Sequence, residues 1–375
     1  MMETPVEIQE EIPRRAWWKQ ASVKLAGAAF LVLAIVSVPV LLSLKKHGGH
    51  PEAPCYFDPT KVFTCSLNNK SGLEYNFYRK SCPEAEQIIR TKVQTFYDHN
   101  SSVAPALIRL VFHDCFIGGC DASVLLDGTA GIKSEKDVIP NLTLKGFDSV
   151  DIIKERLEEV CPATVSCADI VVLAAREALL LVGAPFYPLP TGRRDSTSAY
   201  ADTALNEIPN PNGDLSTILQ QFAVRGFGAR DTVALLGAHN VGVIHCAFLQ
   251  QRLYNFTQTA SGGSDPSIDT KFLAELIARC PNLDNLPEEA RLEMKSSDSE
   301  RFGNHYYDTL LQRRGILKSD QDMMSLEVTA TWVKVFRDDI SLFHRSFADV
   351  MTRLSTFNVT TSPNGNIRVH CSRIE

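Results

Sequence analysis

The sequence lacks several patterns that would each mark a class of protein. No block of Lys and Arg is longer than two residues, and the 375 residues carry a net charge of −6, so no nucleic-acid-binding surface is indicated. None of the ten cysteines belongs to a CxxC pair, which argues against a zinc site. Sustained alternation of apolar and polar residues, internal repeats and low-complexity tracts are also missing, so strands do not dominate the fold.

Apolar residues recur instead at three- and four-residue spacing, which is typical of helices. With 44% hydrophobic and 22% charged residues, the chain has enough apolar side chains for a full core. We therefore expect an all-α, predominantly helical fold. The segments that show the spacing contain Ile89, Val93 and Phe96; Ile152, Leu157 and Val160; Ile170, Val171 and Ala174; and Leu215, Ile218 and Phe222.

The N-terminal region predicts a membrane anchor. Residues 25–44 contain no charge, and twenty helical residues span about 30 Å, the thickness of a bilayer core. Four basic residues precede this run and two follow it, which favours a cytosolic tail at 1–24 and a signal anchor at 25–44. A long, cleavable signal peptide is the alternative. We expect a stem at 45–71 and the main domain at 72–375.

The cysteines and glycosylation motifs agree with an extracellular or luminal location. An even number of scattered cysteines favours disulfides formed in an oxidising compartment. Cys55 and Cys65 of the stem are able to close a small loop of their own. N-x-S/T acceptors occur at Asn69, Asn100, Asn141, Asn255 and Asn358.

The stretch RLVFHDCFIGGCDAS combines several reactive side chains. Its first part continues a predicted helix in which Ser102 is a candidate cap, so Arg109 and His113 project from one face. An imidazole and a guanidinium aimed at one point can remove a proton and stabilise the resulting negative charge. An isolated pair with this spacing is more often an ordinary surface pair. The residues that follow suit a tight disulfide loop, Cys115 to Cys120, and calcium, through Asp114, Asp121 and Ser123.

A second histidine follows another helical run, DTVALLGAHNVG. The small residues Gly237 and Ala238 precede His239, so a flat group can approach closely there. A lone histidine on such a face is more often a core residue than a ligand. Together with the pair of Arg109 and His113, however, His239 indicates a haem iron framed from both sides.

These motifs resemble those of the plant secretory (class III) haem peroxidases. The resemblance covers essentially residues 72–375, through YNFYRKSCPEAEQIIR, RLVFHDCFIGGCDASVLLD, SEKD, the segment GFDSV to AAREA, PTGRRDS, GAHNVGVIHCAFLQQRLYNF, KSDQDMM and GNIRVHC. It implies the haem-peroxidase fold, with haem b between a distal and a proximal helix and four core disulfides.

The resemblance also implies roles for individual residues. His239 would ligate the iron, and Asp320 would accept its ring N–H. His113 would take a proton from hydrogen peroxide, Arg109 would stabilise the developing charge, and Asn141 would orient His113, so that its glycosylation motif stays empty. Phe112 would form a wall of the distal pocket, and phenolic donors would bind near Pro209. The implied disulfides are Cys82–Cys161, Cys115–Cys120, Cys167–Cys371 and Cys246–Cys280, and Asp169 and Arg193 match a buried ion pair.

One of the family's two calcium sites is altered. The distal set is intact, with Asp114, Ile117, Gly119, Asp121 and Ser123 as ligands and Glu135 placed for a contact through water. The proximal set reads Asn240, Lys295, Asp298 and Gly303, in which a lysine and a glycine replace aspartates. Calcium requires oxygen ligands and negative charge, so we expect only the distal ion, with the Lys295 ammonium in the place of the other.

The expected activity is therefore a haem-dependent peroxidase that reduces hydrogen peroxide and oxidises phenolic donors by one-electron steps. One alternative is a membrane-tethered haem-binding interaction protein with weak peroxidase turnover. A second alternative, from another class, is a hydrolase with Cys115 as nucleophile and His113 as base. Against the first alternative, the residues to which the resemblance assigns the chemistry are all intact: Arg109, His113, Asn141, His239 and Asp320. The even number of cysteines and the oxidising compartment argue against the hydrolase.

Overall fold

The computed structural model describes residues 55–56, 64–65, 72–256, 263–282, 290–293 and 302–374. The chain divides into two units, Met1–Leu67 and Asn68–Glu375. In the first unit, β1 (Cys55–Tyr56) pairs antiparallel with β2 (Thr64–Cys65), and Cys55 is the register partner of Cys65. The expected tail and anchor, 1–44, and most of the stem lie outside the described residues. Among the helices that the structure describes, none is long and apolar enough to cross a membrane.

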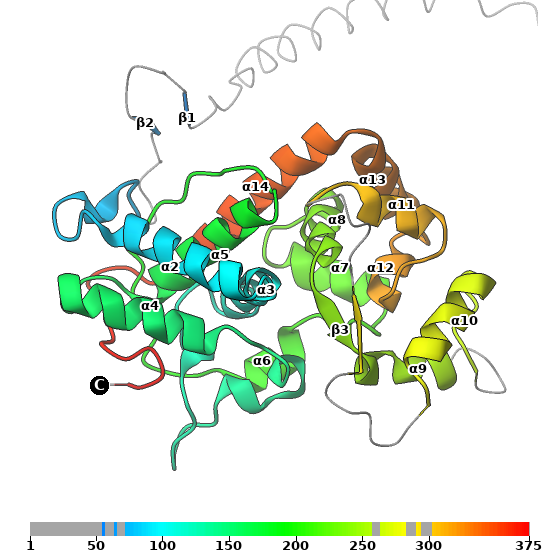
Figure 1. The fold of residues 1–375 in the computed structure, drawn as a ribbon, viewed down its shortest axis with the longest axis horizontal. Coiled ribbons are helices and arrows are strands. Elements are labelled where there is room, and N and C mark those ends of the chain that lie inside the picture. The colour runs from blue at the N-terminus through cyan, green and yellow to red at the C-terminus, as the bar shows by residue number, and fades with distance from the viewer. Residues whose placement is uncertain are drawn as a thin grey trace, which may run out of the picture. The chain divides into compact units, whose positions relative to one another are not determined.

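The second unit is mostly helical, which confirms the predicted fold class (Figure 1). Its strands, β3 (Val243–His245) and β4 (Arg291–Glu293), form one short antiparallel pair. The helices are α2 (Ala85–His99), α3 (Val103–Cys115), α4 (Phe147–Val160), α5 (Cys167–Leu181), α6 (Ala201–Glu207), α7 (Leu215–Ala223), α8 (Ala229–Leu236), α9 (Gln250–Tyr254), α10 (Thr270–Arg279), α11 (His305–Leu311), α12 (Lys318–Asp322), α13 (Glu327–Asp338) and α14 (Ile340–Thr356).

Helix α5 is the centre of the N-terminal half of this unit. All its residues from Cys167 to Leu179 are buried, as expected for a helix that is apolar on nearly every side. Ser166 begins the helix by accepting a hydrogen bond from the Asp169 backbone N–H at 3.1 Å. Helices α2, α3 and α4 pack against α5 (Figure 1). This packing fixes the orientation of α3 and therefore of its distal pair, Arg109 and His113.

Helix α8 leads to the second histidine and is held by α11, α13 and α14. It ends at Leu236, and the 3₁₀ turn η5 (Gly237–Asn240) continues to His239. A Cβ on Gly237 would lie 2.5 Å from the Tyr307 hydroxyl and 2.6 Å from Phe343. The absence of a side chain at Gly237 therefore serves the packing of α8 on α11 and α14, which corrects the prediction that this glycine makes room for a flat group.

All four disulfides that the resemblance implied are present. Cys82–Cys161 joins the segment before α2 to the end of α4, and Cys115–Cys120 closes the loop after α3. Cys167–Cys371 ties the start of α5 to the C-terminal segment, and Cys246–Cys280 connects the turn after β3 to the end of α10. Because Cys115 is bonded to Cys120, it offers no thiolate, and the hydrolase alternative is wrong.

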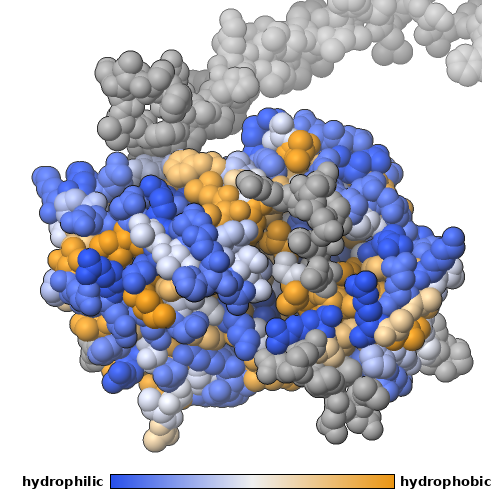
Figure 2. Space-filling view, viewed as in Figure 1, coloured by the Kyte–Doolittle hydropathy of each residue, from blue (hydrophilic) through white to orange (hydrophobic). Residues whose placement is uncertain are grey.

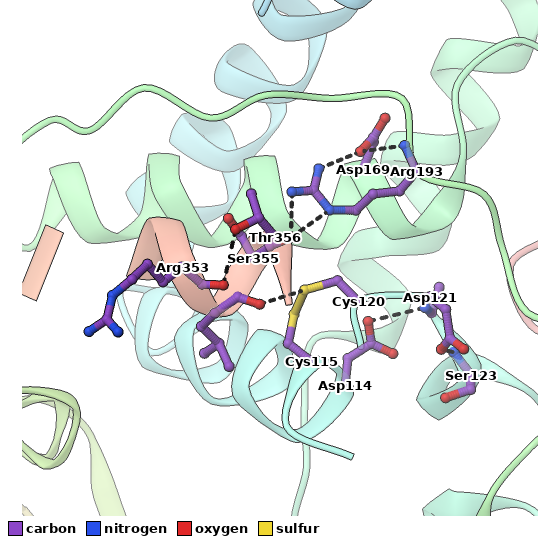
Figure 3. The surroundings of a disulfide bond; sticks show 12 residues. Asp114, Cys115, Cys120, Asp121, Ser123, Asp169, Arg193, Arg353, Ser355 and Thr356 are labelled. Carbon is purple, nitrogen blue, oxygen red and sulfur yellow. Dashed lines mark hydrogen bonds and ion pairs between the residues drawn. A yellow bond between two sulfur atoms is a disulfide. The ribbon is translucent and has the colours of Figure 1, made fainter. Parts of the chain in front are cut away.

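The start of α3 differs in detail from the expectation. Ser102 occupies the cap position but its side chain makes no capping hydrogen bond. Asn100 takes part of that role, because its Oδ1 accepts from the Ser102 N–H at 3.0 Å. The ion pair of Asp169 and Arg193 is present, at 2.7 Å, with both side chains fully buried (Figure 3).

Candidate active site

The distal pair lies on one face of α3, as the sequence predicted. His113 is buried, and its Nδ1 is 2.6 Å from Oδ1 of Asn141 in the turn η4 (Ile139–Asn141). The Asn141 amide nitrogen donates to the backbone carbonyl of Glu135 at 2.9 Å, so its Oδ1 must face the imidazole as an acceptor. Nδ1 of His113 therefore carries the proton, and Nε2 is left with a lone pair.

The surroundings of His113 keep it neutral. Burial, together with the nearby positive charge of Arg109, lowers the pKa of His113 to about 3, although the hydrogen bond to Asn141 opposes this effect. Burial also lowers the pKa of Arg109 to about 10, which leaves the guanidinium charged near neutral pH. The pair therefore presents a neutral base and a permanent cation side by side.

Arg109 is held by the loop that contains Asn141. Its Nη1 donates to the Thr143 hydroxyl at 3.1 Å, and its Nη2 donates to the Pro140 carbonyl at 2.8 Å. No motif in the sequence predicts this role for Thr143. The one signal for it was the glycosylation motif at Asn141, in which Thr143 is the third residue.

Phe112 lies next to His113 and is half-buried. Its ring stacks on Phe116 with centroids 4.8 Å apart, and on Phe222 of α7 at 6.1 Å. The Phe112 ring therefore lies beside the distal pair, and Phe222 of the neighbouring helix α7 helps to fix the orientation of this ring. Pro209, predicted near the donor, lies between α6 and α7 and is half-buried.

The proximal group consists of His239, Asp320 and a tyrosine. His239 Nδ1 is 2.9 Å from Oδ1 of Asp320, which lies in α12 and is 1% exposed. The Tyr306 hydroxyl donates to the same oxygen at 2.8 Å, a contact that was not predicted from the sequence. With Nδ1 occupied, His239 has Nε2 left for a metal. A cavity of about 270 Å³ borders all three residues.

The candidate calcium ligands form a buried acidic group at the end of α3 (Figure 3). Asp114 Oδ2 accepts from the Ala122 N–H at 3.1 Å, whereas its Oδ1 is buried without a partner. Glu135 Oε1 accepts from the Tyr200 N–H at 2.9 Å, and its Oε2 is likewise buried without a partner. Burial and the neighbouring carboxylates raise the pKa of Asp114 and of Glu135. Unpaired oxygens and uncompensated negative charge are the properties of a cation site.

The carbonyl and hydroxyl ligands are arranged around the same loop. Asp121 Oδ1 accepts from the Ser123 N–H at 3.1 Å. Gly119 has a φ of 113°, a backbone conformation that is strained for any residue with a side chain. Ile117 and Ser123 are buried in that loop. Within the described ranges no three His, Cys, Asp or Glu side chains converge on one point, so a cation here would depend on backbone and hydroxyl oxygens as well.

The candidate proximal calcium residues lie only partly within the described structure. Lys295 and Asp298 lie outside the described residues. Asn240, which follows His239, donates from its side-chain amide to the Gly303 carbonyl at 2.5 Å and is 3% exposed. The two described residues of this set are therefore joined directly to each other.

Comparisons with known proteins show what the chain is similar to. The family model described as "Peroxidase" matches residues 89–339. The chain is 47% identical over 338 residues to the Arabidopsis thaliana protein called "Putative Peroxidase 48", covering 81% of this chain and 83% of that protein. It is 41% identical to "Peroxidase 30" of the same plant, over 81% and 92% of the two chains, and 36% identical to "Peroxidase 49", over 94% and 99%.

Proposed function

The chain belongs to the peroxidase family and is a peroxidase, and we propose that it reduces hydrogen peroxide to water while it oxidises phenolic donors one electron at a time. The balanced reaction consumes one peroxide and two phenols and gives two waters and two phenoxyl radicals. The hydrogen bond between His113 Nδ1 and Asn141 Oδ1 is the observation that carries this proposal, because it leaves Nε2 as a base.

The family implies haem, and the residues of the site fit it. His239 would ligate the iron through Nε2, since Nδ1 is bonded to Asp320. Haem, when bound, supplies the redox centre that accepts oxidising equivalents from peroxide and passes them on singly. We propose haem b, which requires no covalent attachment to this chain.

The distal residues handle the protons and charge of the peroxide. His113 Nε2 takes the proton from one peroxide oxygen and returns a proton to the other, so that the second oxygen leaves as water. The Arg109 guanidinium stabilises the negative charge on the departing oxygen. Asn141 keeps the imidazole in the required tautomer, and Phe112 limits the space above the site.

One calcium ion completes the site. Asp114, Asp121, Ser123 and the carbonyls of Ile117 and Gly119 would hold it, with Glu135 in contact through water. The unpaired Asp114 and Glu135 oxygens support this assignment. For the proximal side, we propose no calcium, because the Asn240 side chain bonds to the Gly303 carbonyl where the family's ligands would lie.

Absorption spectroscopy of the purified full-length protein tests the proposed activity. A Soret band that shifts when one equivalent of hydrogen peroxide is added, and returns when a phenol is added, would agree with it. His113→Leu should keep the band and lose the shift, and His239→Ala should lose the band. A band that does not respond to peroxide in the unsubstituted protein would favour the alternative, a membrane-tethered haem-binding interaction protein with weak turnover.

The location of the protein is a separate proposal. Residues 25–44 would anchor it in a membrane with 1–24 in the cytosol, and the stem 45–71 would carry the peroxidase domain 72–375 in an extracellular or luminal space. The disulfides support an oxidising compartment. Alkaline extraction of membranes should leave the protein in the pellet, whereas a mature N-terminus beyond residue 44 would mean that the segment is cleaved and the protein secreted.

A further inference from the structure

The end of η4 and the loop that follows it contact both residues of the distal pair, His113 and Arg109. Asn141 binds His113, and two residues later the Thr143 hydroxyl accepts from Arg109. Leu142, between them, is 63% exposed. Two backbone hydrogen bonds fix the turn, from the Asn141 N–H to the Val138 carbonyl and from the Leu144 N–H to the Asn141 carbonyl, both at 2.8 Å.

The contacts to Arg109 define the plane of its guanidinium. Thr143 and the Pro140 carbonyl take one N–H each from Nη1 and Nη2, and a guanidinium is a planar group with five N–H donors. Two acceptors on different nitrogens fix that plane, and the remaining donors stay available for a ligand. Without the Thr143 hydroxyl, the Arg109 guanidinium would keep only its hydrogen bond to the Pro140 carbonyl and could rotate about that contact.

We propose that Thr143 is a positioning residue that holds Arg109 toward the substrate, so that Asn141–Leu142–Thr143 orients both members of the distal pair. The proposal rests on the proposed function, because the pair acts on peroxide only if that function is correct. It also assigns an internal role to both polar residues of a motif that reads as a glycosylation acceptor. The buried Asn141 amide is therefore not available for a glycan in the folded protein.

Two substitutions at one position test the proposal in the full-length protein loaded with haem. Thr143→Val keeps the shape and removes the hydroxyl, and Thr143→Ser keeps the hydroxyl. The rate constant for the first reaction with peroxide should fall about tenfold in T143V, the effect of losing one hydrogen bond to a charged group. It should stay within about twofold in T143S, and the later reaction with a phenol should be unchanged in both.

A binding measurement separates positioning from a general loss of structure. Fluoride, an anion that ligates ferric haem, should bind T143V more weakly than the unsubstituted protein by a similar factor, with T143S restoring its affinity. The Soret absorbance per protein and the melting temperature should be the same in all three proteins. Mass spectrometry should find Asn141 unmodified in the unsubstituted protein, so that loss of the motif in T143V has no effect of its own.

The outcomes distinguish this inference from the proposed function. If the unsubstituted protein reacts with peroxide and T143V matches it in rate and fluoride affinity, the role of Thr143 is wrong and the function stands. Equal losses in T143V and T143S, or haem loss in T143V, would also overturn the positioning role. A lack of reaction in the unsubstituted protein would count against the proposed function, and normal fluoride binding by T143V would then decide against Thr143 as well.

Discussion

Asp320 Oδ1 accepts hydrogen bonds from two groups, His239 and Tyr306, and this sharing sets how strongly it polarises the imidazole. In Tyr306→Phe the carboxylate keeps only the His239 contact. If His239 ligates haem iron as proposed, its imidazole would gain anionic character and would stabilise ferric over ferrous iron. One hydrogen bond of about 1 kcal/mol corresponds to about 40 mV for a one-electron couple, and we expect a more negative potential by that amount.

Spectroelectrochemistry of the haem-loaded variant measures this shift. Tyr307→Phe is the matched control, because the Tyr307 hydroxyl donates to the Val233 carbonyl rather than to Asp320. An unchanged potential in Y306F, or an equal shift in Y307F, would contradict the role of Tyr306.

His113 predicts a particular pH dependence. Its pKa of about 3 means that the base is neutral above that pH, so the reaction with peroxide should lose rate only in strong acid. Asn141→Asp places a carboxylate against the imidazole, and an adjacent negative charge raises a histidine pKa by about two. The acid limb of the pH–rate profile should therefore move up by about two pH units.

Stopped-flow measurements between pH 3 and 8 check this expectation. Asn100→Asp makes the same chemical change at an exposed residue outside the site and should leave the profile unaltered. A profile that does not differ between N141D and the unsubstituted protein would mean that Asn141 is not coupled to the base.

At the scale of elements, we expect the end of α3 and the loop that follows it to depend on the proposed calcium ion. Without calcium, the raised pKa of Asp114 means that the folded state binds more protons than the unfolded state above about pH 4. The free energy of unfolding of the calcium-free protein should therefore decrease as the pH rises, until the folded-state carboxyl has titrated. Calcium at the proposed site would remove this cost by compensating the carboxylates.

Chelation tests the dependence directly. Removing a ligand held at a hundredfold excess over its dissociation constant costs about 2.7 kcal/mol, or a fall of about 5 °C in melting temperature, and the fall should be larger at pH 8 than at pH 5. Metal analysis should find one calcium per chain. Asp121→Asn should abolish the response to chelator, and a count of two ions would contradict the proposed loss of the proximal site.

Some features of the helices and strands could be predicted from the sequence, and others could not. The spacing of Arg109 and His113 predicted their common face, since the helical period alone determines it. The strands β3 and β4 were not predicted, because three residues each are too few to show alternation. The role of Gly237 was predicted wrongly. A glycine in the sequence does not show whether the space beside it is filled by a ligand or, as here, by the Tyr307 side chain.

Contacts between distant segments were the least predictable part of the site. The resemblance, rather than any local pattern, supplied Asn141 and Asp320, which lie 28 and 81 residues from the histidines they contact. Thr143 and Tyr306 had neither source. Their roles depend on tertiary geometry that no spacing in the sequence encodes.

At the scale of the whole molecule, one disulfide links the centre of the fold to its end. Cys167 and Cys371 are 204 residues apart, and loop-closure entropy gives this cross-link about 5 kcal/mol, against about 2 kcal/mol for Cys115 and Cys120, which are five apart. Replacing both cysteines of the long loop with Ala should therefore lower the free energy of unfolding about 2.5 times as much as the same change in the short loop.

Denaturant titration without reductant, at saturating calcium, measures both double variants. Saturating calcium keeps the proposed site at Asp114 filled, so that the stability lost with the short disulfide is measured apart from any loss of calcium. Equal losses for the two variants would show that constraint of the unfolded chain is not the main contribution of the long disulfide.

The burial of Asn141, which is 2% exposed, has a consequence during synthesis. The enzyme that attaches glycans reads the extended nascent chain, and in that state the tripeptide at Asn141 looks like any other acceptor. Packing of the loop against α3 conceals the asparagine, whereas a sugar attached first would keep the loop from closing on His113. In a secretory compartment, the fraction of active molecules would then depend on the rate of folding relative to the rate of glycosylation at Asn141. Translation speed and temperature would therefore control the yield of active enzyme.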